Sequence, residues 1–176
     1  RTDWADNSRD GGHVTWSRLP VRWSFMCGND ELPEFVAAAD WWNARAGNVF
    51  ERVPEEATCL CLDGGCPVLL ITEGLTPLDP FDIPDSGIRT YARTHLARTD
   101  SRIKGVVIRY YDPYWDTTPE TRMTIARHEL GHALGMMHTD NERCLMYPTV
   151  DRDLVSPKTE CKSELEQIKK HYERGM

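Results

Sequence analysis

The sequence predicts one α+β domain in which helices pack against a mixed β-sheet. The chain has 176 residues, which is about the size of one domain and enough to bury a core of its own. Short segments of alternating apolar and polar residues, typical of half-buried strands, are separated by segments with helical periodicity. The expected order is a strand, a helix, several strands, a second helix, a loop-rich stretch and a last helix, and this order indicates the fold class.

The first half of the chain has the signals of one helix and most of the strands. Residues 21–25 alternate apolar and polar side chains, which predicts a strand. A helix is expected to run to about Ala46, because Asn29 or Asp30 can cap its start and Gly47 stands where a helix can stop. Further strands are predicted at residues 50–53, 68–72, 88–94 and 105–110.

The second half of the chain predicts two helices separated by loops. Thr118 followed by Pro119 is a typical helix start, and this helix should run to about residues 134–135. Ser163 and Glu166 form a capping-box pattern at the start of a last helix. Three side chains share one face of that helix, namely Leu165, Ile168 and Tyr172.

The composition excludes several classes of partner. The chain has 21 Lys and Arg residues against 28 Asp and Glu residues, a formal charge of −7, which disfavours binding to the phosphates of nucleic acids. No apolar run approaches the roughly 20 residues that a membrane span needs. With 40% hydrophobic and 28% charged residues, the chain has the composition of a folded globular protein rather than a disordered one.

A stretch reading HELGHALGMMH, in the second predicted helix, carries the chemistry of this sequence. His128 and His132 are four residues apart, so their imidazoles project from one face of the helix, and this spacing suits a single zinc ion. Gly135 can end the helix in a sharp turn that brings His138 back as a third ligand. Glu129 lies beside the pair, where it can reach a zinc-bound water. Three histidines leave one position open, as in a catalytic zinc site.

The alternative is that these side chains belong to an ordinary solvated helix face. Two histidines and a glutamate alone would leave that alternative open. The glycine and the third histidine make it improbable, since each fixed position matches by chance in roughly a few per cent of cases. Leu130, Ala133 and Leu134 in between suit a helix face buried in a core.

The full pattern HExxHxxGxxH resembles the metzincin clan of zinc endopeptidases. That clan has a tight turn that bears a methionine beneath the metal, and residues 144–148, CLMYP, are similar to it. The resemblance implies that Met146 packs under the three imidazoles without binding the metal. The sequence LMYP at residues 145–148 and Thr139 resemble the matrixins, the matrix metalloproteinase family. Cys144 and the sequence pattern GMxH at residues 135–138 are instead similar to adamalysins.

The resemblance, specific over about residues 118–150, implies both a fold and an activity. The implied fold is a mixed, mostly parallel twisted sheet of about five strands with a backing helix, an active-site helix and a C-terminal helix. The implied activity is hydrolysis of internal peptide bonds in extended polypeptides by a zinc-activated water, with Glu129 as the general base. The alternative is a metzincin relative that binds zinc but is narrowly specific or inactive, and that acts as a binding module or a processing factor.

The resemblance also indicates where a polypeptide would bind. In the clan, the edge strand above the active-site helix holds the substrate in antiparallel, extended form, and the best candidate is the strand at 88–94 with Ile88, Thr90 and Ala92. Residues 148–157 would wall the pocket for the residue that follows the cleaved bond. The candidate side chains there are Thr149, Val150, Arg152 and Leu154.

Six cysteines are either a disulfide framework or metal ligands. Because the histidine motif already supplies a zinc site, we expect three disulfides. Cys144 with Cys161 is the best pairing, since it would tie the methionine-bearing turn to the last helix. Cys27 with one member of the cluster Cys59, Cys61 and Cys66 is plausible, and the sequence leaves the remaining connectivity open.

Other residues receive less specific interpretations. His13, His95 and His171 are read as ordinary histidines, and with only His95 before the active helix no second zinc of the matrixin type is expected. The acidic loops at 73–85 and 112–116 could bind Ca²⁺ but are more typical of solvated loops. Among the aromatic residues, Tyr114, Trp115 and Tyr147 are expected to pack rather than to bind substrate.

The whole chain, residues 1–176, is interpreted as one catalytic domain. We expect an N-terminal arm at 1–13, an upper subdomain at about 14–135 and a lower subdomain at about 136–176. The disulfides and the resemblance imply a secreted, monomeric protease whose signal segment lay upstream. Related enzymes are often silenced by an upstream propeptide, which would be a latency element here.

Overall fold

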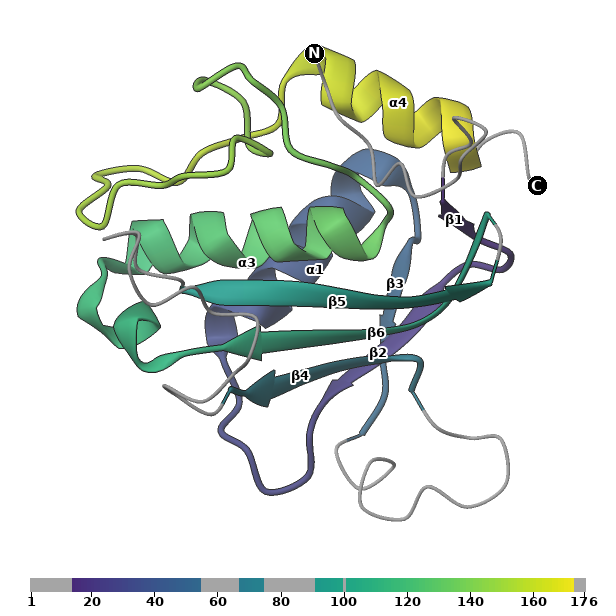
Figure 1. Ribbon diagram of the computed structural model, residues 1–176, viewed down its shortest axis with the longest axis horizontal. Helices are drawn as coiled ribbons and strands as arrows, with labels where there is room; N and C mark the ends of the chain where they lie inside the picture. The colour runs from purple at the N-terminus through teal and green to yellow at the C-terminus, as the bar shows by residue number, and fades with distance from the viewer. Residues whose placement is uncertain (1–13, 55–66, 75–90, 100, 173–176) are drawn as a thin grey trace.

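The computed structural model describes residues 14–54, 67–74, 91–99 and 101–172. Within these residues, six strands form one twisted sheet (Figure 1). The strands are β1 (Thr15–Trp16), β2 (Val21–Phe25), β3 (Phe50–Arg52), β4 (Leu69–Glu73), β5 (Ala92–Thr99) and β6 (Arg102–Tyr110). The strand order is β1-β6-β4-β2-β3, and β5 pairs with β6.

The pairing of the strands confirms a mixed and mostly parallel sheet. The pairs β1–β6, β4–β6, β2–β4 and β2–β3 are all parallel, and only β5–β6 is antiparallel. The parallel strands β2 and β4 have the apolar character expected of strands covered by other elements, with Trp23, Leu69 and Ile71 fully buried. Among the described strands β5 pairs with β6 alone, so its other edge is the one that faces α3.

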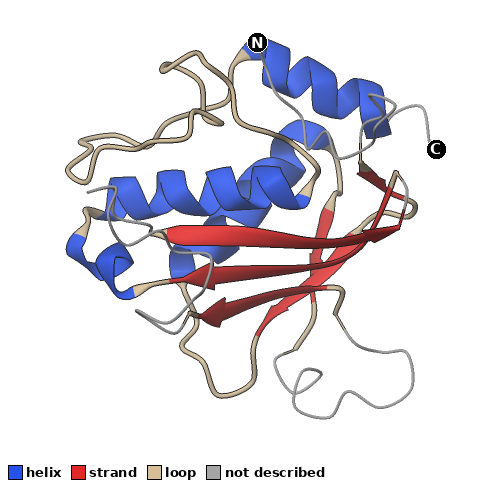
Figure 2. Ribbon diagram, in the orientation of Figure 1, coloured by secondary structure: helices blue, strands red, loops and turns tan. Residues whose placement is uncertain are grey.

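Helices cover the sheet and lie beside its antiparallel edge (Figure 2). They are α1 (Pro33–Ala46), the short 3₁₀ helix η1 (Asp112–Asp116), α3 (Pro119–Ala133) and α4 (Lys162–Tyr172). α3 runs alongside β5 with α1 behind it, and α4 lies beyond the end of α3 (Figure 1). The expected α+β architecture with a backing helix, an active-site helix and a C-terminal helix is therefore confirmed. None of the described helices is long and apolar enough to cross a membrane.

α1 confirms the predicted helix but not its predicted cap. The residue before the helix is Leu32, whose side chain makes no capping hydrogen bond. Asn29 has a different role, because its Oδ1 accepts hydrogen bonds from Thr72 Oγ1 (2.6 Å) and from the Glu73 backbone N–H (3.1 Å). The helix stops at Gly47 as predicted, with a positive φ of 84°.

α3 begins and ends where the sequence predicts. Thr118 caps its first turn, with Oγ1 accepting a hydrogen bond from the Thr121 N–H (3.2 Å), and Pro119 follows the cap. At the other end, Gly135 has a φ of 96°. A Cβ atom on Gly135 would collide with the carbonyl oxygen of Val14, so only glycine fits this turn.

Two strands differ from the sequence-based expectation. The strand predicted at 88–94 is β5, which runs from Ala92 to Thr99, and residues 88–90 lie outside the described part of the chain. The prediction ended too early because β5 is an edge strand with partly exposed side chains, so its alternation of apolar and polar residues is weak. The two-residue strand β1 was not predicted, because it is too short for a periodic pattern and depends on its pairing with β6.

α4 starts with a different capping arrangement from the predicted one. Ser163 and Glu166 are exposed, and the carboxylate of Glu164 makes the cap instead. Its Oε2 accepts a hydrogen bond from the Cys161 N–H (2.7 Å), and its Oε1 accepts one from the Met146 N–H (2.9 Å). Glu164 therefore accepts hydrogen bonds from two segments, the start of α4 and the turn at Met146. A capping pattern within one helix does not reveal the second of these contacts.

The hydrophobic core lies between the sheet and the helices. The predicted apolar stripe of α1 is buried, and Tyr114 of η1 is fully buried as expected. Trp115 is 50% exposed, so its prediction as a core residue is wrong. Its ring packs against the ring of Tyr114 in a T-shaped arrangement, with 5.3 Å between the two centroids, and about half of the residue remains exposed to solvent.

Candidate active site

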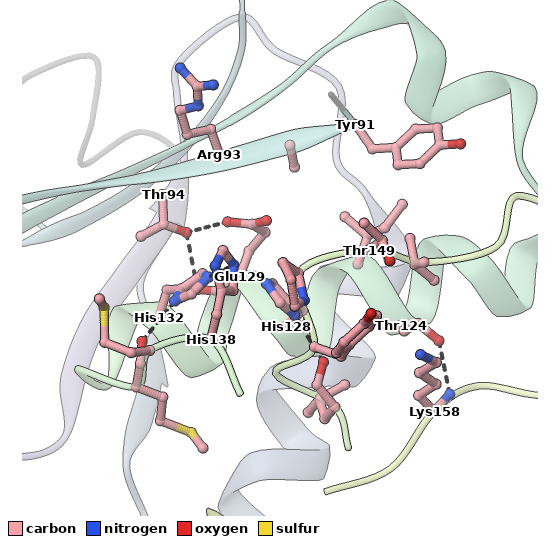
Figure 3. Close-up of a pocket in the computed structure, with 18 of the residues that line it drawn as sticks. Tyr91, Arg93, Thr94, Thr124, His128, Glu129, His132, His138, Thr149 and Lys158 are labelled. Atoms are coloured by element: carbon pink, nitrogen blue, oxygen red, sulfur yellow. Dashed lines mark hydrogen bonds between the residues drawn. The ribbon is translucent and has the colours of Figure 1, made fainter. Parts of the chain in front are cut away.

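Three histidine side chains from two segments meet beside β5. α3 presents His128 and His132 one turn apart, and the turn at Gly135 returns His138 to them (Figure 3). Their ring centroids are separated by 4.6 Å, 5.2 Å and 4.8 Å. One nitrogen from each ring lies within 4.8 Å of the others, so the three could hold one metal ion.

Main-chain carbonyls fix the tautomers of two of these rings. His128 Nδ1 lies 2.9 Å from the Leu145 carbonyl oxygen, and His132 Nδ1 lies 2.7 Å from the Met136 carbonyl oxygen. A carbonyl only accepts hydrogen bonds, so each Nδ1 carries the proton and donates it. The lone pair of each Nε2 is then free for a metal, which is the orientation that metal-binding histidines usually have.

Burial keeps the three imidazoles neutral at physiological pH. It lowers the pKa of His128 well below its ordinary value. A second positive charge would be unfavourable beside His132, His138 and Lys158 as well, and the hydrogen bond to the Leu145 carbonyl only partly opposes this. Burial lowers the pKa of His132 as well, and it lowers that of His138 to about 4. Neutral imidazole is the form that binds zinc, so the donor set fits Zn²⁺ in both chemistry and protonation.

Glu129 is buried between α3 and β5, away from the cluster of imidazole nitrogens. Thr94 of β5 donates from Oγ1 to Glu129 Oε2 (2.5 Å) and lies 3.2 Å from the Glu129 carbonyl oxygen (Figure 3). Burial raises the pKa of Glu129 to about 7, and the hydrogen bond from Thr94 and the charge of Arg93 act in the opposite direction. A carboxyl group with this pKa can both take up and release a proton near neutral pH.

A cavity of about 770 Å³ opens onto these residues. Its walls come from β5, from α3 and from the segment that follows His138, including Tyr147 and Pro148. Of the predicted substrate-binding residues, Ala92, Thr149 and Val150 line it. Ile88 and Thr90 lie outside the described residues, so their roles stay predictions.

Comparison with known proteins places this chain in a family. The family model of the matrixins matches residues 78–173, more than half of the chain, and that range includes the three histidines and Glu129. The chain belongs to the matrixin family. No curated protein matches the chain. Matrixins are zinc metallopeptidases that act on polypeptides and are typically extracellular.

In this matrixin, Met146 lies directly against the active-site helix. It is fully buried, and a Cβ atom on Gly131 would stand 2.6 Å from its Sδ, so the sulfur occupies space that only a glycine leaves open. The Met146 carbonyl oxygen accepts a hydrogen bond (2.9 Å) from the N–H of Thr139, which is the residue directly after His138. The sequence singled out Met146 and Thr139, but gave no signal for the close approach at Gly131.

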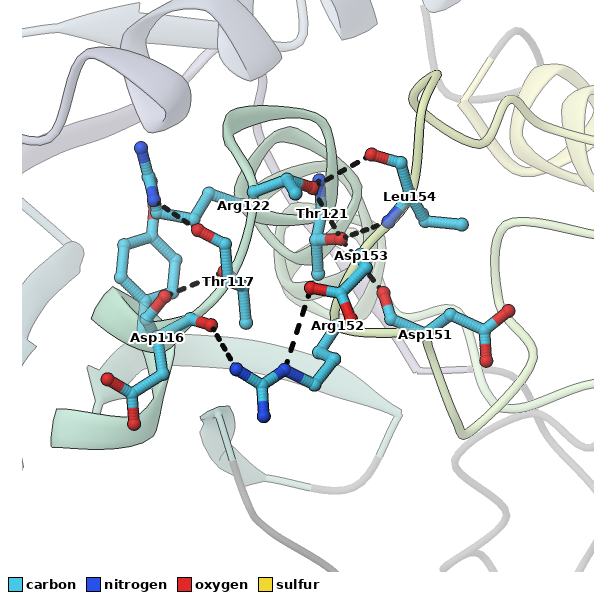
Figure 4. Close-up of polar contacts among 10 residues, drawn as sticks. Asp116, Thr117, Thr121, Arg122, Asp151, Arg152, Asp153 and Leu154 are labelled. Carbon is cyan, nitrogen blue, oxygen red and sulfur yellow. Dashed lines mark hydrogen bonds and ion pairs between the residues drawn. The ribbon is translucent and has the colours of Figure 1, made fainter.

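The segment after Met146 is held on α3 by a row of threonines. Thr118 Oγ1 donates to the Leu154 carbonyl (2.9 Å), and Thr121 Oγ1 donates to the Asp151 carbonyl (2.8 Å). Thr121 Oγ1 also accepts a hydrogen bond from the Leu154 N–H (3.1 Å) (Figure 4). These hydrogen bonds hold the main chain of Leu154 against the flank of α3. Leu154, a candidate for the pocket wall, does not line the cavity.

Arg152, another of the candidates for the pocket wall, does not line the cavity. Its guanidinium group donates to the Asp116 carbonyl (3.3 Å) and lies 3.6 Å from Asp153, on the outer side of the segment (Figure 4). Tyr147, expected only to pack, does line the cavity, as do Thr124 and Lys158, which were not predicted. Figure 3 shows Thr124 and Lys158 on the side of His128 that is opposite His132.

One predicted disulfide of this matrixin is confirmed. Cys144 and Cys161 are bonded, which ties the turn at Met146 to the start of α4 and excludes these two thiols as metal ligands. Cys27 is disulfide-bonded too, and Cys59, Cys61 and Cys66 lie outside the described residues, so its predicted pairing with one of them stays a prediction.

Proposed function

We propose that this matrixin is a zinc-dependent endopeptidase that hydrolyses internal peptide bonds of extended polypeptides. The observation that carries this proposal is the combination of three neutral imidazoles and one buried carboxyl group on a single cavity. Metal binding and general-base catalysis need different residues, and the cavity has residues suited to each. His128, His132 and His138 would hold the metal, and Glu129 is not part of that set.

Zinc held by these imidazoles would act as a Lewis acid toward the substrate carbonyl and would lower the pKa of a water molecule. The proton chemistry then belongs to Glu129. Its Oε2 is engaged by Thr94, which leaves Oε1 to take the proton of the attacking water and to deliver it to the leaving amine. A pKa of about 7 suits both transfers, since the group must gain and lose one proton in each cycle.

The edge of β5 that pairs with none of the described strands supports binding of an extended polypeptide. Among the described strands β5 pairs only with β6, so its outer edge has main-chain groups that an added strand could use. A substrate that runs antiparallel to β5 would enter at the Thr99 end and leave at the Ala92 end. The bond to be cleaved would then lie between Thr94 and the three histidines. Ile88, Thr90, Ala92, Thr149 and Val150 are the side chains proposed to contact it.

The decisive experiment compares Glu129→Ala with the wild-type protein on casein or gelatin, with and without a chelator. We expect hydrolysis to fall at least about thousandfold in the variant while zinc stays bound, because Glu129 supplies the general base and not a ligand. Glu166→Ala, which removes an exposed carboxylate on α4, is the matched control and should keep full activity. Substantial hydrolysis by Glu129→Ala would sink the assignment.

The same experiment addresses the alternative function. A wild-type protein that retains zinc but cleaves neither casein nor gelatin would favour a binding module or a narrowly specific processing factor. We also propose that the protein acts outside the cell as a monomer, and that an upstream propeptide could serve as its latency element. The Cys144–Cys161 disulfide supports an oxidising compartment. Bound Ca²⁺ and the division into subdomains at 14–135 and 136–176 stay predictions.

A further inference from the structure

Lys158 stands at the end of the cavity that lies beyond His128. Figure 3 shows it below Thr124 and across from Thr149, on the side of the site where Tyr91 precedes β5. A substrate antiparallel to β5 leaves the site on this side. The residue that follows the cleaved bond would therefore direct its side chain toward Lys158.

The main chain of Lys158 is held on both sides. Its N–H donates to Thr124 Oγ1 (2.9 Å), and its carbonyl oxygen accepts a hydrogen bond from Arg127 Nη1 (2.8 Å). Arg127 is itself stacked over the ring of Trp41, at 4.4 Å from the ring centroid. Lys158 is thus anchored to two consecutive turns of α3, and its side chain starts from a fixed point in the cavity wall.

The ammonium group of Lys158 contacts uncharged groups. Nζ donates to the main-chain carbonyl of Glu142 (2.9 Å) and lies 5.5 Å from the ring centroid of Tyr147, and both of these partners are neutral. Within the described part of the chain no carboxylate forms an ion pair with Lys158. The one carboxylate among the described residues that line the cavity is Glu129, which Thr94 holds on the opposite side of His128.

We propose that Lys158 makes this end of the cavity selective for substrates with Asp or Glu directly after the cleaved bond. The inference rests on the proposed peptidase function and names the class of substrate for it. Leu145 and Val150 line the same cavity as the aliphatic stem of Lys158, and the ammonium group offers the opposite charge to a carboxylate. The whole chain has a net charge of −7, so the positive charge of Lys158 is a property of this pocket and not of the protein as a whole.

The test uses three quenched fluorescent peptides that differ only in the residue after the cleaved bond, which is Glu, Gln or Leu. For the zinc-loaded wild-type protein we expect kcat/KM for the Glu peptide to exceed that for the Gln peptide about fivefold, as for a partly exposed ion pair. The ratio should fall toward one at high salt. Lys158→Met keeps the aliphatic stem and both main-chain hydrogen bonds, and it should bring the ratio of the Glu peptide to the Gln peptide to one.

Lys162→Met is the matched control, because it removes a lysine from the exposed start of α4 and should leave the ratio unchanged. A second readout is the affinity of the Glu and Gln peptides for zinc-loaded Glu129→Ala with and without Lys158→Met, measured by calorimetry. Stronger binding of the Glu peptide that depends on Lys158 supports the inference even without turnover.

A wild-type protein that cleaves the Gln and Leu peptides with chelator sensitivity but shows a Glu to Gln ratio near one, or a preference for Leu alone, overturns the inference and leaves the peptidase function standing. Cleavage of no peptide counts against the peptidase function instead. In that case equal affinities for the Glu and Gln peptides overturn the inference as well.

Discussion

At the scale of single residues, the contact between Thr94 and Glu129 controls the carboxyl group at the centre of the proposed reaction. Opposing influences act on its pKa. Burial raises the pKa, and the hydrogen bond from Thr94 and the charge of Arg93 lower it, so that the pKa is about 7. The same hydrogen bond orients the group, because it engages Oε2 and leaves Oε1 without a bond to Thr94. Thr94 is therefore a positioning residue whose removal should be visible in the pH dependence of the activity.

Thr94→Val should shift the acidic limb of the pH profile of kcat/KM to higher pH. Without the hydrogen bond that stabilises the ionised form, the pKa of Glu129 rises, and the base is then protonated over a wider range. We expect activity at pH 6 to fall about tenfold relative to the wild-type protein, with a smaller loss at pH 8. Thr94→Ser keeps the hydroxyl group and should restore the wild-type profile. Identical profiles for the Val and Ser variants would contradict this role.

At the scale of elements, the segment from Tyr147 to Cys161 depends on α3 for its position. It has no regular secondary structure, and side chains of α3 satisfy its main-chain groups instead. Thr118, Thr121 and Thr124 stand three residues apart along the helix, so they form one row on its flank, and the segment is laid along this row. The disulfide between Cys144 and Cys161 closes the segment at its base. The cavity wall is therefore ordered by the same helix that carries two of the histidines.

Thr121→Val tests this anchoring, since it keeps the shape of a fully buried side chain and removes its hydroxyl group. The groups left unpaired are the Asp151 carbonyl and the Leu154 N–H. We expect the free energy of unfolding, measured with denaturant, to fall by about 2 kcal/mol. KM for peptides should rise more than kcat falls, because the wall of the cavity loosens. Thr121→Ser should recover more than half of the lost stability, and a Ser variant as unstable as the Val variant would argue against the hydrogen bonds.

At the scale of the whole molecule, both ends of the described chain meet where α3 turns toward His138. Trp16 Nε1 donates to the Ala133 carbonyl (2.7 Å), and the Tyr172 hydroxyl donates to the Leu134 carbonyl (2.6 Å). The Val14 carbonyl lies so close to Gly135 that no Cβ atom fits between them. The last carbonyls of α3 are thus satisfied by side chains distant in sequence. The turn that leads to the third histidine is therefore packed against both ends of the described chain.

Gly135→Ala and Gly47→Ala separate packing from backbone conformation. Both glycines have positive φ, 96° and 84°, but a Cβ atom meets nothing within 4 Å at Gly47. For Gly47→Ala we expect a loss of about 1 kcal/mol in the free energy of unfolding, the cost of the conformation alone. Gly135→Ala should lose more than about 3 kcal/mol, because the collision with Val14 must be relieved too.

The zinc content of the purified variants provides the second measurement. Displacement of His138 should weaken zinc binding by Gly135→Ala, whereas Gly47→Ala should bind zinc like the wild-type protein. Equal losses of stability in the two variants, with zinc binding intact in both, would show that the contact with Val14 has no influence on the turn.

The parts of the fold and site that were predictable are those governed by neighbours along the chain. His128 and His132 share a face because of helix geometry, and Gly135 ends α3 because it accepts a positive φ. The cap at Thr118 follows from the same kind of local rule. Edge strands and short pairings were less predictable. β5 is partly exposed and β1 has two residues, so neither has a strong periodic signal of its own.

The sequence by itself determined the three candidate ligands, the proposed general base and the helix that carries most of them, because a fixed spacing on a helix fixes relative positions over one or two turns. Only the tertiary structure decided what surrounds them. Thr94 reaches Glu129 across 35 residues of chain, Lys158 reaches Thr124 across 34, and Glu164 reaches Met146 across 18. Such contacts depend on how whole elements pack, and packing is set by shape and burial over the complete core rather than by any short pattern of residues.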